Sequence, residues 1–369
     1  MSSPRRIEPT RLAGARFGAQ LLHRPSGVRD AADVARLTGG IQAQDVRAGR
    51  LGFRARSPRL RAADVDRART GERSIVRTWA MRSTMHLLAT DDVHWLLPLF
   101  ENGLAASSRR RLAQLGLDAA AQRKALRAIR GSLEADGYLG RSELVERLRP
   151  IGIEIDAPRR VHLFRLAVAQ GVACLGPDRG AETLLALARE WLGERPRHDR
   201  EEALAELARR YLRAFGPATE ADFAGWAGLG LADVRAALSR IDGELAEARV
   251  GAGRAWMLRG ASRRPPRRIV RLMPAWDNYL MGHRERDFIA PPAEWLRIMP
   301  GGGLLRPAIL ADGIALGTWS MRRRGGHLEV AVEPFAKLEP ETREAIESEV
   351  ADIARFEGSP VTLTPSSVD

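Results

Sequence analysis

One order of elements, three helices followed by a two-stranded hairpin, recurs along this chain and restricts the folds that it can form. In the middle of the chain, apolar residues three and four positions apart predict helices over 119–136, 142–148 and 158–171. Strand-like runs over 172–175 and 182–186 then predict a hairpin. Helix, short helix, helix and hairpin is the order of a winged helix-turn-helix.

The same order is expected twice more. In the next part of the chain it comprises helices over 201–215, 219–227 and 231–241 and strands over 244–250 and 254–258. The first part is less regular. Its expected elements are helices over 11–23, 28–38, 62–69 and 90–100 and a hairpin of strands 77–81 and 84–88.

Beyond about residue 265 the pattern becomes strand-like, at 268–272, 307–310 and 328–332, and an acidic helix over 339–356 follows. We therefore predict an α+β protein. Its expected domains are three tandem winged helix-turn-helix units and a small β-rich C-terminal domain, over 1–112, 113–193, 194–262 and 263–369.

Composition excludes several classes of protein. No apolar run reaches the ~18 residues that a membrane-spanning helix needs, and residues 1–6 are not followed by the apolar region of a signal peptide, so we expect a cytoplasmic protein without membrane contact. Cys174 is the only cysteine, which excludes an internal disulfide and any multi-thiolate metal site. Its apolar neighbours predict a buried, inert thiol. No H-E-x-x-H, P-loop or Rossmann signature occurs, so we expect no metal and no cofactor.

Positive charge is concentrated toward the start of the chain. The net charge is +13; residues 1–112 hold 21 arginines against 10 acidic residues, a net of +11, whereas residues 326–358 have a net of −6. Such a distribution suits a protein whose first part faces phosphates. The alternative is an arginine excess that reflects a GC-rich coding bias and has no partner.

Two glutamines flank one small residue in Gly39-Gly40-Ile41-Gln42-Ala43-Gln44-Asp45, just after a glycine pair that ends a predicted helix. On an extended backbone, Gln42 and Gln44 project from the same side and their amides can converge on one water or polar group. The alternative is a solvated loop in which neither side chain has a role.

Three segments together resemble the AlkZ-like (YcaQ-related) bacterial DNA glycosylases, and the similarity extends over most of the chain. They are Gly40-Ile41-Gln42-Ala43-Gln44-Asp45, Arg77-Thr78-Trp79-Ala80-Met81-Arg82-Ser83-Thr84-Met85-His86-Leu87 and Leu272-Met273-Pro274-Ala275-Trp276-Asp277-Asn278-Tyr279-Leu280-Met281-Gly282-His283-Arg284. The signature of that family is a glutamine, an aliphatic residue and a second glutamine. In the YcaQ branch an aspartate replaces the second glutamine. Gln42-Ala43-Gln44 is similar to the AlkZ version.

The resemblance implies hydrolysis of the N-glycosidic bond of bulky N7-alkylguanines, including interstrand crosslinks, in DNA repair or self-resistance to genotoxins. By similarity, Gln42 would orient the attacking water and Gln44 would support the water or the sugar. Asp45 could serve as their charged partner, although capping of the next helix is the expected role. Lys124 and Lys337 lack the setting of a Schiff-base lysine, so we expect a monofunctional enzyme.

The expected partner is double-stranded DNA that carries an alkylated guanine, bound by a monomer. Arg82 and His86 on the first hairpin are candidates for contact near the lesion, and the alternative for His86 is a half-buried strand residue with a local hydrogen bond. Other arginines suit contacts with phosphates: Arg47, Arg50, Arg54 and Arg77.

Two further groups of residues are expected to be structural. One is a polar cluster that we expect to hold the C-terminal domain against the winged helices, with DNA contact by His283 or Arg284 as the alternative: Asp277, Tyr279, His283 and Arg284. The other is a set of scattered tryptophans expected to anchor the core: Trp79, Trp226, Trp256, Trp276 and Trp319.

Two other functions stay open at this point. The chain could be a DNA-binding regulator without enzymatic activity, which would bind a specific sequence and release no base. It could also be a relative that keeps the fold and binds lesions but has lost catalysis. Release of a base from alkylated DNA identifies the enzyme, and affinity for the lesion without release separates the inactive relative from the regulator.

Overall fold

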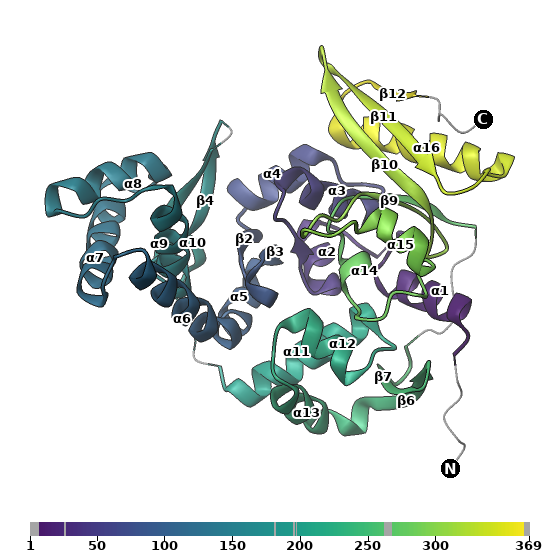
Figure 1. The fold of residues 1–369 in the computed structure, drawn as a ribbon, viewed down its shortest axis with the longest axis horizontal. Helices are drawn as coiled ribbons and strands as arrows, with labels where there is room; N and C mark the ends of the chain where they lie inside the picture. Colours follow the sequence, from purple (N-terminus) through teal and green to yellow (C-terminus); the bar gives the residue numbers. More distant parts are fainter. Residues whose placement is uncertain are drawn as a thin grey trace. The chain divides into compact units, whose positions relative to one another are not determined.

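The structure is a computed structural model that describes residues 7–25, 27–180, 182–194, 196, 198–261 and 268–364 (Figure 1). Residues 1–6 lie outside this range, as do Arg195 and Arg197 of the segment 193–198, which we expect to link the second and third units. Contacts divide the chain into two compact units, residues 1–65 with 204–369, and residues 66–203. Helices and strands occur in both units, so the fold is α+β, as predicted. No helix in the described ranges is long and apolar enough to cross a bilayer.

The unit of residues 66–203 begins with an antiparallel hairpin of β2 (Ile75–Trp79) and β3 (Met85–Ala89), which confirms the predicted hairpin. Its turn has left-handed φ values at Arg82 and Ser83. Two helices follow where one was expected over 90–100: α5 (Thr90–Leu96) and the longer α6 (Pro98–Gln114).

The rest of this unit has the predicted order of elements. It consists of α7 (Ala119–Asp136), α8 (Arg141–Leu148), α9 (Ala157–Ala169), β4 (Ala173–Arg179), β5 (Glu182–Leu187) and α10 (Ala188–Leu192). The spacing that predicted α7 has its expected cause, because Ile129 and Leu133 are buried in one core with Leu144 and Leu163. Cys174 is free and buried on β4, as expected.

The other unit holds both ends of the chain. Its first elements are α1 (Pro9–Ala19), α2 (Ala31–Thr38), β1 (Ile41–Gln42) and α3 (Val46–Arg56), and α4 (Ala62–Thr70) leads into the other unit. The helix expected over 11–23 ends at Ala19, shortly before left-handed φ values at Leu21 and Arg24.

A second set of three helices and a hairpin follows at the predicted place. It is formed by α11 (Arg200–Phe215), α12 (Glu220–Ala227), α13 (Leu231–Arg240), β6 (Leu245–Val250) and β7 (Gly253–Leu258). Thr219 caps α12 by accepting the N–H of Asp222 at 3.0 Å. Tyr211, Phe215 and Trp226 pack their rings together between the helices.

The last part of this unit contains a five-stranded sheet within the described residues, with α16 (Pro340–Glu357) packed against β8 and β12 (Figure 1). The strand order is β12 (Val361–Thr364), β11 (His327–Pro334), β10 (Ile314–Arg324), β9 (Ala308–Ala311) and β8 (Val270–Met273). The only parallel pair in it is β11 with β12. Short helices α14 (Asn278–Met281) and α15 (Pro292–Ile298) lie between β8 and β9 in sequence.

Candidate functional site

The glycine pair before the glutamines ends α2 and redirects the chain. Gly39 is the C-cap of α2 in the left-handed region, with φ of 73°, and Gly40 has φ of 90°. Side chains adopt such angles only at a cost in free energy, so glycine is favoured at both positions. The backbone N–H of Gly40 donates to the carbonyl of Ala35 at 2.7 Å. The chain then enters the short strand β1, which contains Gln42.

Asn278, from a distant part of the sequence, holds this strand in place. The backbone N–H of Gln42 donates to Oδ1 of Asn278 at 3.1 Å, and Nδ2 of Asn278 donates to the carbonyl of Gly40. The same Nδ2 lies 3.4 Å from the carbonyl of Thr38. One buried amide therefore uses both its donor and its acceptor to fix the backbone on either side of Ile41.

The neighbouring Asp277 fixes α3 beneath the same strand. Its carboxylate accepts two hydrogen bonds from the guanidinium of Arg56, at 2.8 and 2.9 Å, and both side chains are wholly buried. Arg56 also donates to the carbonyl of Gly52 at 2.9 Å. A Cβ on Gly52 would lie 2.9 Å from Cγ2 of Ile41, so α3 reaches β1 only with glycine at this position.

The two glutamines have different environments. Gln42 is only 6% exposed, whereas Gln44 lies in a bend after the strand and is exposed. The expected extended backbone is thus present at Gln42 but does not continue regularly to Gln44. Asp45 has the role we expected for it, because it caps α3 by accepting the N–H of Ala48 at 2.8 Å.

Two of the arginines proposed for phosphates, Arg47 and Arg50, lie half-buried on the first turns of α3, next to the glutamines. The Nη2 atom of Arg47 is buried and has no hydrogen-bond partner among the residues that the structure describes. A buried donor without an acceptor costs free energy, so an oxygen supplied by a ligand would stabilise this side chain.

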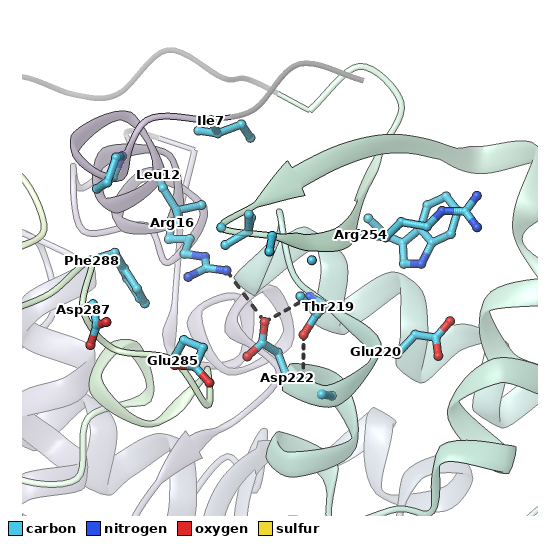
Figure 2. Close-up of a pocket in the computed structure, with 17 residues that line it drawn as sticks. Ile7, Leu12, Arg16, Thr219, Glu220, Asp222, Arg254, Glu285, Asp287 and Phe288 are labelled. Atoms are coloured by element: carbon cyan, nitrogen blue, oxygen red, sulfur yellow. Dashed lines mark hydrogen bonds and ion pairs between the residues drawn. The ribbon is translucent and has the colours of Figure 1, made fainter. Parts of the chain in front are cut away.

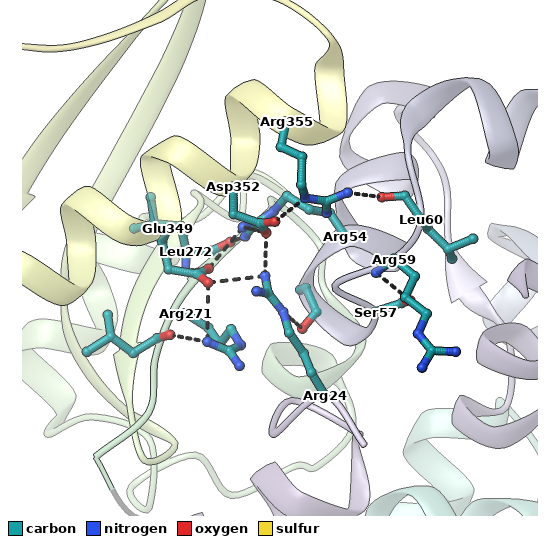
Figure 3. A network of polar contacts seen from close by, with 12 residues as sticks. Arg24, Arg54, Ser57, Arg59, Leu60, Arg271, Leu272, Glu349, Asp352 and Arg355 are labelled. Carbon is teal, nitrogen blue, oxygen red and sulfur yellow. Dashed lines mark hydrogen bonds and ion pairs between the residues drawn. The ribbon is translucent and has the colours of Figure 1, made fainter. Parts of the chain in front are cut away.

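Arg54, further along α3, does not fit the phosphate contact expected for it. Its guanidinium is wholly buried and lies 2.9 Å from a carboxylate oxygen of Asp352 and 3.0 Å from one of Glu349, both on α16 (Figure 3). It also donates to the carbonyl of Leu272 at 2.7 Å. The Arg54 guanidinium therefore joins α3 to α16 and β8 and cannot reach DNA without leaving these partners.

The remaining candidates belong to the unit of residues 66–203. Arg77 on β2 and Arg82 in the turn of the hairpin are partly exposed, as a DNA contact requires. His86 is 1% exposed, and its Nδ1 lies 3.1 Å from the carbonyl of Thr84, so the local hydrogen bond is the better interpretation for it. Burial, and next the charge of Arg82, lower the pKa of His86 to about 3, so the ring is neutral.

Three side chains of the polar cluster after β8, Asp277, Tyr279 and His283, make buried contacts within their unit, as expected of a structural role, while the side chain of Arg284 is exposed. The Tyr279 hydroxyl donates to the carbonyl of Gly313 at 2.8 Å, and Nε2 of His283 donates to the carbonyl of Phe215 at 2.9 Å. The backbone N–H of Arg284 donates to Asp222 at 2.8 Å. With the Asp277–Arg56 pair, these bonds join this segment to several helices of its unit. Two tryptophans, Trp226 and Trp319, are buried as expected, while Trp79, Trp256 and Trp276 are only partly buried.

Comparison with known proteins assigns the family. The family described as "DNA glycosylase AlkZ-like" matches residues 34–356, most of the chain. The chain belongs to this family. The resemblance that the three sequence segments indicated is therefore confirmed, and with it the class of enzyme, a DNA glycosylase.

Similar proteins are known from Streptomyces sahachiroi. An "Interstrand DNA cross-link repair glycosylase" of that organism is 27% identical over 347 residues, which is 89% of this chain and 91% of the relative. The solved structure of the "DNA glycosylase AlkZ" from the same organism matches with a TM-score of 0.79 at 24% identity. The match covers 98% of this chain and all of the other. The AlkZ-like fold thus extends over nearly the whole chain.

Within this AlkZ-like fold, Asn278 is the residue of the site that sequence reasoning missed. It lies inside the segment Trp276-Asp277-Asn278-Tyr279, which carried part of the resemblance, but a neutral side chain among charged and aromatic neighbours did not indicate a role. The site combines a buried amide on a fixed backbone, an exposed amide two residues later and a half-buried arginine. The two amides can orient a water molecule, and the arginine can stabilise a negative charge nearby.

Proposed function

We propose that this AlkZ-like protein is a monofunctional DNA glycosylase for bulky N7-alkylguanine adducts, including interstrand crosslinks, and that it acts as a monomer. The relative from Streptomyces sahachiroi is named for cross-link repair, which supports the crosslink as a substrate. In this proposal Gln42 orients the attacking water, and Gln44 supports the water or the sugar.

The proposed chemistry fits neutral side chains. Alkylation at N7 gives the purine a positive charge, so the base can leave without a strong general acid. What is left for the enzyme is to place a water and stabilise a sugar with oxocarbenium character, and oriented dipoles can do both. A base joined to both strands cannot swing out of the duplex. Its N7 faces the major groove, where a protein can approach it without extrusion.

The observation that carries the proposal is the fixed position of Gln42 in a member of this family. Its side chain is buried on a backbone that Asn278 holds from both sides. A solvated loop residue would have no need of such support. Burial also reduces the number of conformations that the amide must give up when it binds water.

We further propose that the three sets of helices and hairpins are winged-helix units and that four arginines contact DNA. Partial exposure supports these arginines: Arg47, Arg50, Arg77 and Arg82. Arg54 and His86 are left out because both are buried. Contacts of this kind would position the duplex without reading its sequence.

Release of the alkylated base tests the proposed function. The wild-type protein should release N7-alkylguanine from a duplex, detected by mass spectrometry, and leave an abasic site without cutting the strand. Gln42→Ala should lower the rate about 10²–10³-fold, the range for loss of one oriented polar group, and Gln44→Ala should lower it less. Gln114→Ala, at an exposed glutamine on α6, is the matched control and should keep full activity.

A DNA-binding protein without enzymatic activity is the alternative. It predicts tight binding to one sequence, no base release, and no effect of Gln42→Ala. Binding to alkylated DNA without product would instead indicate a relative that has lost catalysis.

A further inference from the structure

A pocket with a volume of about 770 Å³ lies among α1, the start of α12, the β6–β7 hairpin and the loop after α14 (Figure 2). Neither Gln42 nor Gln44 lines it. Apolar and aromatic side chains form much of its wall, including Leu12, Val250, Trp256 and Phe288. In Figure 2, Phe288 and Arg254 lie on opposite sides of it. A pocket of this size with apolar walls and a few polar groups is typical of a small-molecule site.

The positive charges that line this pocket already have partners. The guanidinium of Arg16 donates twice to the carbonyl of Pro217, at 3.0 and 2.8 Å, and lies 3.8 Å from Asp222. The guanidinium of Arg254 lies over the ring of Trp256 and 3.0 Å from a carboxylate oxygen of Glu247. Neither arginine is available for an anionic ligand.

Two carboxylates of the pocket, in contrast, have no such partner. Glu285 and Asp287 are exposed, and neither makes a salt bridge or hydrogen bond within the part of the chain that the structure describes. The side chain of Arg286, between them, donates through Nε to the carbonyl of Leu280 and lies over Trp295, and it acts on Glu285 only through its charge. The lining has four acidic side chains and two arginines, a net of −2 in a chain of net +13.

We propose that this pocket binds a small organic cation with a flat aromatic body and a protonated amine. The flat body fits against the side chains of Leu12, Trp256 and Phe288, and the amine is placed beside Glu285 and Asp287. A cation gains from the carboxylates of Glu285 and Asp287, whereas the same charges repel phosphate. The rings of Phe288 and Trp256 already hold the guanidinium groups of Arg16 and Arg254 on one face, so they offer the ligand apolar contact and not a further cation site. The proposal does not depend on the proposed glycosylase function.

Titration of the full-length protein with three indoles tests this proposal. Tryptamine carries a protonated amine, tryptophol is neutral and indole-3-acetate is an anion, so only the charge differs on one ring system. By calorimetry, tryptamine should bind with a Kd on the order of 1 mM or tighter, as expected for so small a ligand. Tryptophol should bind about tenfold more weakly, and indole-3-acetate should not bind.

Variants locate the binding. Glu285→Gln with Asp287→Asn should weaken tryptamine about tenfold and leave tryptophol unchanged. Glu344→Gln with Glu347→Gln removes the same charge from exposed positions of α16 and should change nothing. Ala221→Phe, inside the pocket, should abolish binding of both indoles. Equal binding of tryptamine and indole-3-acetate, absence of saturable binding, or tryptamine binding that either pocket variant leaves unchanged would overturn the proposal.

Discussion

Burial determines the behaviour of single ionisable residues in this protein more than their sequence context does. His86 and His283 are both nearly inaccessible, and burial is the main cause that lowers the pKa of each to about 3. The ordinary histidine pKa is about 6.5. In the unfolded chain both rings would therefore take up protons that the folded protein excludes.

The stability of the protein should consequently fall as the pH is lowered from 6.5 toward 3. Over that window the unfolded state binds the proton and the folded state does not, so each buried histidine lowers the free energy of unfolding by about 1.4 kcal/mol per pH unit at most. In His86→Gln, unfolding in this pH range should take up about one proton fewer, so the stability should depend less steeply on pH. Urea unfolding at pH 7 and pH 5 measures the difference, and equal pH dependence of the variant and the wild type would contradict the role of His86.

The ion network of Figure 3 offers a second test at the residue level. Four arginines pair with Glu349 and Asp352, so the network holds more positive than negative charge: Arg24, Arg54, Arg271 and Arg355. Glu349→Gln should destabilise the protein by about 3–5 kcal/mol, because it leaves Arg271 without a carboxylate and Arg24 and Arg54 with Asp352 alone. Arg54→Met should cost less, since Glu349 keeps Arg24 and Arg271. Denaturant unfolding of the two variants decides the order, and a larger loss for Arg54→Met would refute this account.

The carboxylates of the same network also make the stability depend on pH, but here the cause is neighbouring charge and not burial. Although burial opposes it, the charges of Arg54 and Arg24 hold the pKa values of Glu349 and Asp352 below their usual range. Their stabilisation is present above the pKa of the unfolded chain, about 4, and is lost as the pH falls below it. As the pH falls, the histidines should therefore lower the stability first, from about pH 6.5, and the carboxylates should add to the loss below about pH 4.

At the level of elements, the support of β1 by Asn278 can be tested directly. Asn278→Ala should lower kcat for base release about tenfold or more and change DNA affinity little, because a misplacement of about 1 Å can cost 10²-fold in rate. Asn278→Asp can still accept from Gln42 but cannot donate to the carbonyl of Gly40, so it should be no better. If both variants keep wild-type kcat, Asn278 does not position Gln42.

Elements whose pattern is local could be predicted from the sequence, and those that depend on distant partners could not. The helix α7 was predicted with its observed bounds because Ile129 and Leu133 repeat at helical spacing on one buried face. The strand β10 was missed, because Gly317 and a run of arginines at its end hide the alternation, and its pairing with β9 and β11 forms the strand.

The candidate site shows the same limit. The capping role of Asp45 could be predicted because it depends on neighbours within a few residues. The Asn278 hydrogen bonds span more than 230 residues and appear only in the folded chain. For the same reason the sequence did not distinguish Arg54, paired with α16, from the half-buried Arg47.

For the whole molecule, the net charge overstates the number of positive side chains that DNA can contact. Several arginines of the basic first part are buried, including Arg16, Arg54, Arg56 and Arg69. The acidic C-terminal helix α16 accounts for part of the compensating charge, because Glu349 and Asp352 pair with Arg54. The contribution of each arginine to DNA binding should therefore follow its exposure and not its position in the sequence.

The salt dependence of DNA affinity tests this view. Each arginine that neutralises a phosphate contributes about one unit to the slope of log affinity against log salt. Arg47→Ala should lower the slope by about 1, while Arg54→Met, with its fold verified by circular dichroism, should leave the slope unchanged because its charge is already paired. Arg343→Ala, an exposed arginine on α16, serves as the control for loss of one surface charge. Fluorescence anisotropy with an undamaged duplex over a range of salt concentrations provides the slopes, and equal changes for Arg47→Ala and Arg54→Met would show that burial does not decide which arginines contact DNA.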